Sequence, residues 1–350
     1  MVGRAAVSTR GRPFARGALL AGATVTLLVI EGCFRAPEAA PASDAPELYG
    51  AGLFSTGEWD FFMAFSPDER DVLFCRADST FSSYQIYGTH LTGDGTWSAP
   101  VVPRFAAGWS NADPHISPDG TTLFFISNRP ADGAAAPQTT YDIWRARREP
   151  DGDWGVPERL NAPVSMAGVD EWSPSVAANG DLYFGSERPG GRGGMDLWVA
   201  RRVEGRYGEV ENLGDSVNTT GNEVEPWIAP DESYLVFSVS GVRESGDSAG
   251  HYDLYLSRRV GGAWQRAVPL GHGVNSRGSD FNQSVSPDGR WLYFSSTRPL
   301  TVPVGDRFDS PRDDRTVRGL GDGQGDIYRI ALSLFGLGPD VRSRSGGRRT

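Results

Sequence analysis

Residues 285–296 read VSPDGRWLYFSS, and residues 116–127 read ISPDGTTLFFIS. Each stretch places Ser-Pro-Asp-Gly between an apolar residue and a run of large apolar side chains. Pro presets φ, and Asp and Gly tolerate a tight corner, so the pattern predicts a hairpin turn between two β-strands. The turn recurs in altered form along the chain. Its corner is occupied by Asp68, Asp119, Asn179, Asp231 and Asp288, with spacings of 51, 60, 52 and 57 residues.

Further strands follow each hairpin at similar distances. A third strand begins after a variable loop, near Gln85, Asp142, Asp196, Asp253 and Asp326. A fourth is introduced by an aromatic residue, namely Trp97, Trp154, Tyr207 and Trp264. Four antiparallel strands repeated at this period are typical of propeller blades. We therefore predict an all-β protein, a β-propeller built from four-stranded blades.

The number of blades follows from how the repeats begin and end. The fifth repeat stops after its third strand, near residues 330–332, with no aromatic residue to begin a fourth. Before the first repeat, Pro46-Glu47-Leu48 resembles the segment at 157–160 that precedes the third. We expect the N-terminal segment to complete the last blade, which gives five blades over residues 46–332. A sixth, degenerate blade from residues 299–325 is the alternative.

The N-terminal region has the features of an export signal. Residues 1–16 carry four Arg and no acid, and residues 17–30 are apolar but too few for an ordinary membrane span. Cys33 follows at a spacing that resembles a bacterial lipobox, although Glu31 stands where a small residue is expected. We predict a signal peptide (1–32), lipidation at Cys33 and an Ala/Pro-rich tether (33–45). Cleavage near residues 40–42, or an uncleaved anchor, is the alternative.

These features predict an exported protein of the periplasm or outer membrane. Its contact with a membrane would be through the lipid anchor alone, and residues 333–350 would form a disordered basic tail. The net charge of −10 argues against a duplex nucleic-acid partner, which requires a basic face. With 45 Gly and 24 Pro, a coiled coil or helical bundle is excluded. Cys75 lies within an apolar strand, and we interpret it as a small buried side chain.

The repeats resemble the WD40-like Pro-Asp β-propeller repeats of the TolB type. The resemblance rests on the Ser-Pro-Asp-Gly turns, the strand at 292–296 and the Asp-Ile-Tyr strand at 326–328. Residues 188–196, which read RPGGRGGMD, match one subgroup of these repeats. The resemblance implies an exported propeller of the bacterial envelope that serves as a binding or scaffold module. It implies no fixed enzymatic activity.

Candidate site residues lie in the loops that enter each first strand, because these loops share one face with the loops between the second and third strands. One aligned set is Asp60, Asn111, Glu171, Glu223 and Asp280, and two positions on come Phe62, Asp113, Ser173, Glu225 and Asn282. Repeated acids beside a channel suit a divalent cation such as Ca²⁺ or a polar ligand. The alternative is structural: the acids cap the first strand or pair with a neighbouring blade.

Three arginines form the other candidate set. Arg129, Arg188 and Arg298 end the second strand of three blades, and Asp142, Asp196, Asp253 and Asp326 begin the third strand of four. As a ligand site, the arginines would clamp an anionic group. The alternative is that these Arg and Asp residues pair or cap within each blade.

Together these observations favour a monomeric, non-enzymatic envelope module that binds a protein, peptide or glycan on its channel face. Apart from a possible channel-bound divalent cation, no cofactor is expected. The alternative function is a glycan-processing enzyme that uses channel carboxylates. Its candidate carboxylates are Asp60, Asp113, Glu171, Glu225 and Asp280. Residues 246–250 match a nucleophile-elbow string, but no strand-turn-helix pattern surrounds them.

Overall fold

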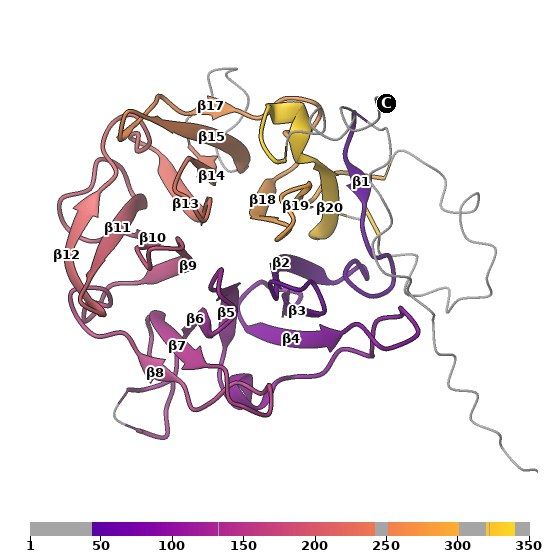
Figure 1. Ribbon diagram of the computed structural model, residues 1–350, viewed down its shortest axis with the longest axis horizontal. Helices are drawn as coiled ribbons and strands as arrows, with labels where there is room; N and C mark the ends of the chain where they lie inside the picture. The colour runs from indigo at the N-terminus through magenta and orange to yellow at the C-terminus, as the bar shows by residue number, and fades with distance from the viewer. Residues whose placement is uncertain (1–43, 132, 242–250, 301–319, 322, 340–350) are drawn as a thin grey trace, which may run out of the picture. The chain divides into compact units, whose positions relative to one another are not determined.

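A computed structural model of the chain describes residues 44–131, 133–241, 251–300, 320–321 and 323–339. Its β-sheets form the five blades of a propeller around a central axis, as Figure 1 shows, which confirms the predicted fold class. The strands are β2 (Trp59–Phe65), β3 (Asp71–Ala77) and β4 (Tyr84–His90) in blade 1; β5 (Asn111–Ile116), β6 (Thr122–Ser127), β7 (Asp142–Arg147) and β8 (Glu158–Arg159) in blade 2; β9 (Glu171–Val176), β10 (Leu182–Ser186), β11 (Asp196–Val203) and β12 (Arg206–Asn212) in blade 3; β13 (Asn222–Ile228), β14 (Tyr234–Ser240), β15 (Asp253–Val260), β16 (Ala263–Trp264) and β17 (Val268–Pro269) in blade 4; and β18 (Asp280–Val285), β19 (Trp291–Ser296), β20 (Asp326–Ala331) and β1 (Glu47–Leu48) in blade 5.

The outer edge of the blades is less regular than the sequence predicts. Blade 3 has a full fourth strand, β12, which begins beside Tyr207 as expected. Blade 1 has only three strands, so the prediction of a fourth strand there is wrong. Trp97 and Val101 instead make isolated bridges to Leu91 and Gly88. Pro100 lies between Trp97 and Val101, and Pro103 follows; because proline cannot donate to a ladder, the pairing is not extended.

The ring is closed by the N-terminal segment, as predicted. Strand β1 pairs with β20, with Glu47 opposite Arg329 and Leu48 opposite Tyr328. The ladder is extended by Tyr49, whose N–H donates to the Ile327 carbonyl at 2.8 Å. Figure 1 shows β1 beside β20 although they come from opposite ends of the chain. The last blade is therefore a four-stranded sheet whose outermost strand comes from the N-terminal segment.

The Pro-Asp turns are held by short-range hydrogen bonds. In blade 2 the Ser117 hydroxyl donates to Asp119 at 2.6 Å and accepts from the Thr122 N–H at 3.0 Å. Asp119 in turn accepts from the Thr121 N–H at 3.0 Å. The same bonds recur in blade 5, where the Ser286 hydroxyl donates to Asp288 at 2.6 Å. The turns thus form from residues within five positions of one another.

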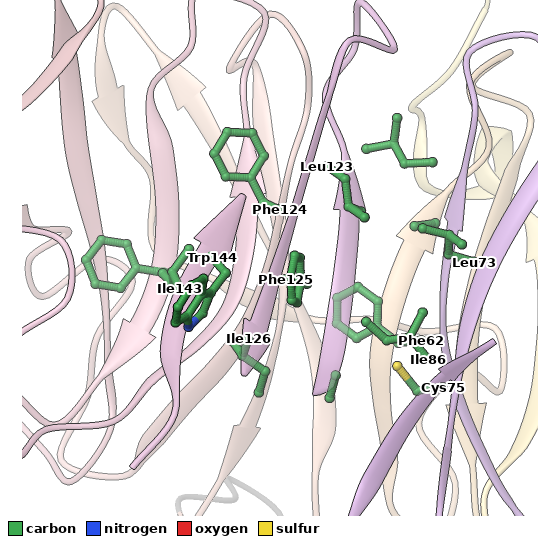
Figure 2. Packing of buried hydrophobic residues seen from close by; sticks show 14 of the residues in the cluster. Phe62, Leu73, Cys75, Ile86, Leu123, Phe124, Phe125, Ile126, Ile143 and Trp144 are labelled. Atoms are coloured by element: carbon green, nitrogen blue, oxygen red, sulfur yellow. The ribbon is translucent and has the colours of Figure 1, made fainter. Parts of the chain in front are cut away.

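The core consists of apolar clusters between neighbouring blades. The largest lies between blades 1, 2 and 3 and includes Leu123, Phe125 and Ile143, all fully buried. Figure 2 shows part of it, with the second strand of blade 2 contributing Leu123, Phe124, Phe125 and Ile126. Cys75 lies in the same cluster as a free, buried thiol, as predicted. Face-to-face packing of twisted sheets therefore supplies the hydrophobic stabilisation of the ring.

Several predictions fall on residues outside the described ranges. These are the signal peptide, the Cys33 lipidation site, nearly all of the tether, the nucleophile-elbow string and most of the alternative sixth-blade segment. The predicted disordered tail begins too early: Leu332–Phe335 form a 3-10 helix, η3, and Leu332 and Leu337 pack into the core. The apolar side chains at these positions can bury area against blade 5. A second 3-10 turn, η1, spans Arg104–Ala106. Within the described ranges, no helix is long and apolar enough to span a membrane.

Candidate functional site

The inner strand of every blade contains a β-bulge at the same place. Register shifts interrupt the pairing of β2, β5, β9, β13 and β18 with their second strands. One non-glycine residue in each has a positive φ, between 49° and 57°: Phe62, Asp113, Ser173, Glu225 and Asn282. A left-handed conformation costs a non-glycine residue about 1–2 kcal/mol and redirects its side chain. The second aligned set from the sequence is therefore the ring of bulge residues around the channel.

Two of these bulge residues are carboxylic acids that connect neighbouring blades. Asp113 Oδ2 accepts hydrogen bonds from the Ser173 N–H at 3.0 Å and the Ser173 hydroxyl at 2.7 Å, which joins blade 2 to blade 3. Glu225 Oε2 accepts from the Asn282 N–H at 2.6 Å, which joins blade 4 to blade 5. It also accepts from the Ser238 hydroxyl at 2.7 Å within blade 4. Each acid thus has one oxygen held by neutral donors.

Above this ring lies a central pocket of about 430 Å³, to which every blade contributes. We call it the channel pocket, and its lining is Trp59, Phe61, Phe81, Tyr84, Ala112, Asp113, Trp172, Ser173, Met195, Val224, Glu225, Tyr252, Ser279, Phe281, Asn282 and Thr297. The residues come from the inner strands and from the loops between second and third strands, so these loops share one face, as predicted. Within this set, Asp113 and Glu225 are the only carboxylic acids, and there is no Arg or His.

The acidity of the two carboxyls is set by their surroundings. Loss of hydration raises the pKa of Asp113 to about 6, and the hydrogen bonds from Ser173 oppose this rise. Loss of hydration likewise raises the pKa of Glu225 to about 7, and the nearby charge of Asp113 raises it further. Groups with pKa values in this range can accept or donate a proton near neutral pH. The pocket therefore combines apolar walls with two groups suited to proton transfer or to holding a positive charge.

The first aligned set of candidates lies elsewhere, inside the blades. Asp60, Asn111, Glu171, Glu223 and Asp280 are fully buried and outside the channel pocket. Asp60 pairs with Arg76 at 2.6 Å, and its carboxyl also accepts from the Thr56 N–H at 2.7 Å. Glu223 accepts from the Thr219 N–H at 2.9 Å. These contacts agree with the structural alternative, while a ligand-binding role for this set stays a prediction.

The three candidate arginines complete the same buried clusters. Arg188 lies 3.1 Å from Glu171, Arg298 lies 2.7 Å from Asp280, and the Arg129 guanidinium donates to Asn111 Oδ1 at 2.7 Å. The expected partners were the aspartates that begin the third strands. Asp142 instead pairs with Arg159 at 2.6 Å. Arg129, Arg188 and Arg298 thus find their partners within their own blades, as the structural alternative holds. These partners lie on the first strand of each blade and not on the third.

Sequence reasoning missed the aromatic walls of the pocket. Trp172 and Phe281 directly precede the bulge residues Ser173 and Asn282, and Phe61 directly precedes Phe62. The signal was available in the aligned repeats, since the position before each bulge residue is apolar in all five: Phe61, Ala112, Trp172, Val224 and Phe281. Phe81 and Tyr252, from the loops between second and third strands, and Tyr84, at the start of β4, have no such periodic signal, because these loops vary in length.

The opposite end of the channel has a smaller cavity. Its volume is about 180 Å³, and it is lined by apolar side chains and by the prolines of the Pro-Asp turns. Phe62, His115 and Ser284 also line it. Burial lowers the pKa of His115 to about 4, so the imidazole is neutral at pH 7. Among the described residues, no group of three or more His, Cys, Asp or Glu side chains is placed to hold a metal ion. The channel-bound cation stays a prediction.

Comparison with known proteins bears on the function. No family model matches the chain. Its sequence is 28% identical over 197 residues to the uncharacterized peptidase YuxL of Bacillus subtilis (strain 168), a match that covers 51% of this chain and 28% of that protein. Solved structures with a similar fold include TolB from Acinetobacter baumannii (TM-score 0.42, 14% identity, 81% of this chain and 55% of TolB). They also include a puromycin-hydrolyzing peptidase of Mycobacterium tuberculosis (TM-score 0.37, 14% identity, 76% of this chain and 41% of that one).

The sequence match corrects the predicted function. The relative is a peptidase, which contradicts both the non-enzymatic binding or scaffold module and its glycan-processing alternative. The resemblance to Pro-Asp repeats misled on this point because such repeats define the propeller and carry no information about the chemistry served by it. The match spans less than a third of the length of this relative, so the relative's activity is not transferred to this chain by the match alone.

Proposed function

We propose that this chain acts in peptide hydrolysis and takes up peptide substrates through the channel pocket. The similarity to a peptidase supports the reaction class. The observation that carries the location is the pocket itself, because it is the place where apolar walls and groups that titrate near neutral pH meet on one face. Pockets that combine these features are the default substrate sites of proteins.

The dimensions of the pocket suit part of a peptide. A volume of about 430 Å³ falls within the range of roughly 300–1,000 Å³ that is typical of small-ligand sites. Such a space accommodates one end of a peptide or a few side chains, but no folded domain. Trp59, Trp172 and Phe281 supply apolar surface for substrate side chains. Ser279 and Thr297 also line the pocket and supply hydroxyls that can bond to peptide groups.

A hydrolysis assay with a pocket-filling variant tests the proposal. The purified protein is incubated with a mixture of unstructured peptides, and new amino termini are detected by mass spectrometry. Met195 lines the pocket from the loop between β10 and β11, so Met195→Trp should fill it and reduce cleavage by tenfold or more. Val203→Trp is the matched control, since Val203 is 63% exposed on β11. The proposal fails if the parent cleaves nothing, or if Met195→Trp cleaves like the parent.

We also infer that the chain is related to the WD40-like Pro-Asp repeats and is exported as a lipoprotein. The recurring Pro-Asp corners and the TolB-like fold support the relationship. The Arg-rich N-terminus, the apolar run and Cys33 support export and anchoring in the cell envelope. In that location the substrates would be peptides of the periplasm or cell surface.

A further inference from the structure

We propose that the channel pocket selects peptides by an organic cation, an ammonium or guanidinium group on an apolar stem, which its aromatic rings surround and which Asp113 and Glu225 neutralise. This inference rests on the proposed function and specifies the class of substrate. It covers two sources of the same chemistry, the side chain of Lys or Arg and the free amino terminus of a peptide. The argument rests on the charges and rings of the pocket and on how the same chain binds its own arginines.

Three of the six acids of the inner strands have an arginine partner, and a fourth, Glu223, is hydrogen-bonded by Thr219. Asp60 lies 2.6 Å from Arg76, and Glu171 lies 3.1 Å from Arg188. Asp280 lies 2.7 Å from Arg298. A buried carboxylate without a counterion is strongly destabilising, so these pairs are what the fold requires.

The two acids of the channel pocket have no arginine partner among the residues that the structure describes. Among the described residues, Asp113 and Glu225 form no salt bridge, and the hydrogen bonds to their side chains come from Ser173, Asn282 and Ser238, which are neutral donors. These bonds converge on Oδ2 of Asp113 and Oε2 of Glu225, so Oδ1 and Oε1 are the oxygens left for a ligand. Since both residues line a cavity, a bound cation can supply the missing charge.

The aromatic rings complete a site for a cation. Along one wall, Trp59 packs edge-on against Phe81 at 5.0 Å between centroids, Phe81 against Tyr84 at 5.3 Å, and Tyr84 against Trp172 at 6.3 Å. This wall is contributed by blades 1 and 3. Aromatic faces carry negative potential and attract ammonium and guanidinium groups, most strongly where water is excluded.

A second group of rings comes from blades 4 and 5. There Tyr252 lies 6.5 Å from Phe281, centroid to centroid. Burial raises the pKa of Tyr252 and of Tyr84, and the negative charges of Glu225 and Asp113 respectively contribute to these rises, so one acid is near each group of rings. A cation between the two groups of rings would therefore meet both rings and carboxylates.

The chain already uses this combination internally. The Arg298 guanidinium lies 5.2 Å from the Phe294 ring centroid and 4.9 Å from that of Tyr328, while it pairs with Asp280. Arg188 lies 4.6 Å from the Phe184 centroid while it pairs with Glu171. Each internal site holds a guanidinium between rings and a carboxylate. The channel pocket presents the same two components, and none of the described residues that line it is a cation.

Other ligand classes fit the pocket less well. An anionic ligand would be repelled by the carboxylates, and a neutral one would leave them uncompensated. A bare metal ion needs several oxygen ligands, and the described residues do not group three acidic or His side chains. Aromatic walls also contribute little to a hard metal ion, but they bury the methylene groups of a Lys or Arg stem.

The test compares peptides that differ in one charge. The N-acetylated amides Ac-Ala-X-Ala-NH₂, with Arg, Lys, norleucine or Glu at X, are titrated at pH 8, and so is H-Ala-Nle-Ala-NH₂ with a free amino terminus. Binding is followed by tryptophan fluorescence, since Trp59 and Trp172 line the pocket. The Arg and Lys peptides, or the free-amine peptide, should bind at least about tenfold more tightly than acetylated norleucine, and the Glu peptide should bind most weakly. Which of these peptides gains identifies the source of the cation.

Two variants and a matched control assign the preference to the pocket. Asp113→Asn with Glu225→Gln keeps acceptor oxygens for Ser173 and Asn282 and should abolish the preference for cations. Trp172→Leu leaves both carboxylates in place and should weaken the cationic peptides selectively. Asp151→Asn with Glu209→Gln removes the same charge at exposed positions and should change nothing.

The possible outcomes separate this inference from the proposed function. Equal binding of all peptides would overturn the selection by charge and leave peptide uptake intact. The small cation benzyltrimethylammonium provides the reverse case: if it binds through Asp113 and Glu225 while no peptide binds or is cleaved, the cation site stands and the proposed function falls. If neither the peptides nor this cation binds, the inference is refuted.

Discussion

Arg188 offers the sharpest test of how the buried charges hold the blades together. Its side chain is 5% exposed and lies 3.1 Å from Glu171, which is fully buried. The guanidinium also donates to the Pro163 carbonyl at 2.9 Å and to the Val164 carbonyl. Arg188→Met keeps much of the apolar volume against the Phe184 ring but removes every one of these donors.

The expected loss follows from what remains behind. Removing one partner of a buried ion pair costs about 3–5 kcal/mol, because the other charge stays buried and uncompensated. That is a large part of the roughly 5–15 kcal/mol that stabilises a typical protein. In the double variant with Glu171→Gln no charge is left, so about 2 kcal/mol should be regained. The two carbonyls still lack donors, which prevents a full recovery.

The effect should also depend on pH. Burial raises the pKa of Glu171 to about 8 even with Arg188 present. A carboxyl whose pKa is higher in the folded than in the unfolded state stabilises the fold at low pH and loses this contribution as pH rises through the folded value. The decrease in the free energy of unfolding caused by Arg188→Met should therefore be smaller at pH 6 than at pH 9. The double variant should show no such trend from this site.

Urea unfolding followed by tryptophan fluorescence measures these differences. Arg192→Met is the matched control, because Arg192 is exposed and is expected to change the free energy of unfolding by no more than about 0.5 kcal/mol. If the free energy of unfolding of Arg188→Met is within about 1 kcal/mol of the parent value at pH 9, the ion pair does not stabilise the fold. A loss of peptide binding without loss of stability would then favour the ligand-clamp interpretation.

Three further predictions concern ring closure, pH and the anchor. Phe54→Ala should lower the free energy of unfolding by about 3–5 kcal/mol, because Phe54 is 1% exposed and lies between Tyr49 and blade 1. The control Val156→Ala, at an 88% exposed position, should lower it by less than about 0.5 kcal/mol. Equal melting temperatures of the two variants would contradict this prediction. Removing the carboxyls with Asp113→Asn and Glu225→Gln should abolish a fall in stability between about pH 3 and pH 8 of about 3 kcal/mol per group, since both pKa values are raised, and unfolding curves at several pH values measure it. Cys33→Ala should move the protein from the membrane to the soluble fraction, and unchanged partition would exclude lipidation.

The propeller could be predicted from the sequence because its signals are local. The Ser117 and Asp119 side chains bond within five residues of one another, and each turn leads directly into a buried strand. The closure by β1 was also predictable. The last repeat ends after its third strand, and a short segment before the first repeat resembles a fourth strand, so the two can pair. The missing fourth strand of blade 1 was harder to predict, because Trp97 begins this segment as an aromatic residue begins the fourth strand of the other blades, and only the pairing shows that Pro100 and Pro103 interrupt it.

The functional prediction failed for a different reason. The repeats describe a scaffold, and the same scaffold serves unrelated activities, so the repeats could not indicate which activity this propeller serves. The candidate acids were found, but the pattern of the repeats does not show which of the two aligned sets lies in the channel. Only one of the two sets reaches the channel, because a positive φ at the bulge residues redirects their side chains.

By itself, the sequence determined the repeat, the class of fold, the five blades and the way the ring closes. These features depend on contacts within a hairpin or on a spacing that repeats along the chain. The tertiary structure decided which acids receive an arginine and which face the pocket. Glu171 and Arg188 meet because adjacent strands bring together residues 17 positions apart, whereas Asp113 meets Ser173 across 60 positions and two blades. The channel pocket exists only where five separate strands converge, so no single stretch of the chain contains it.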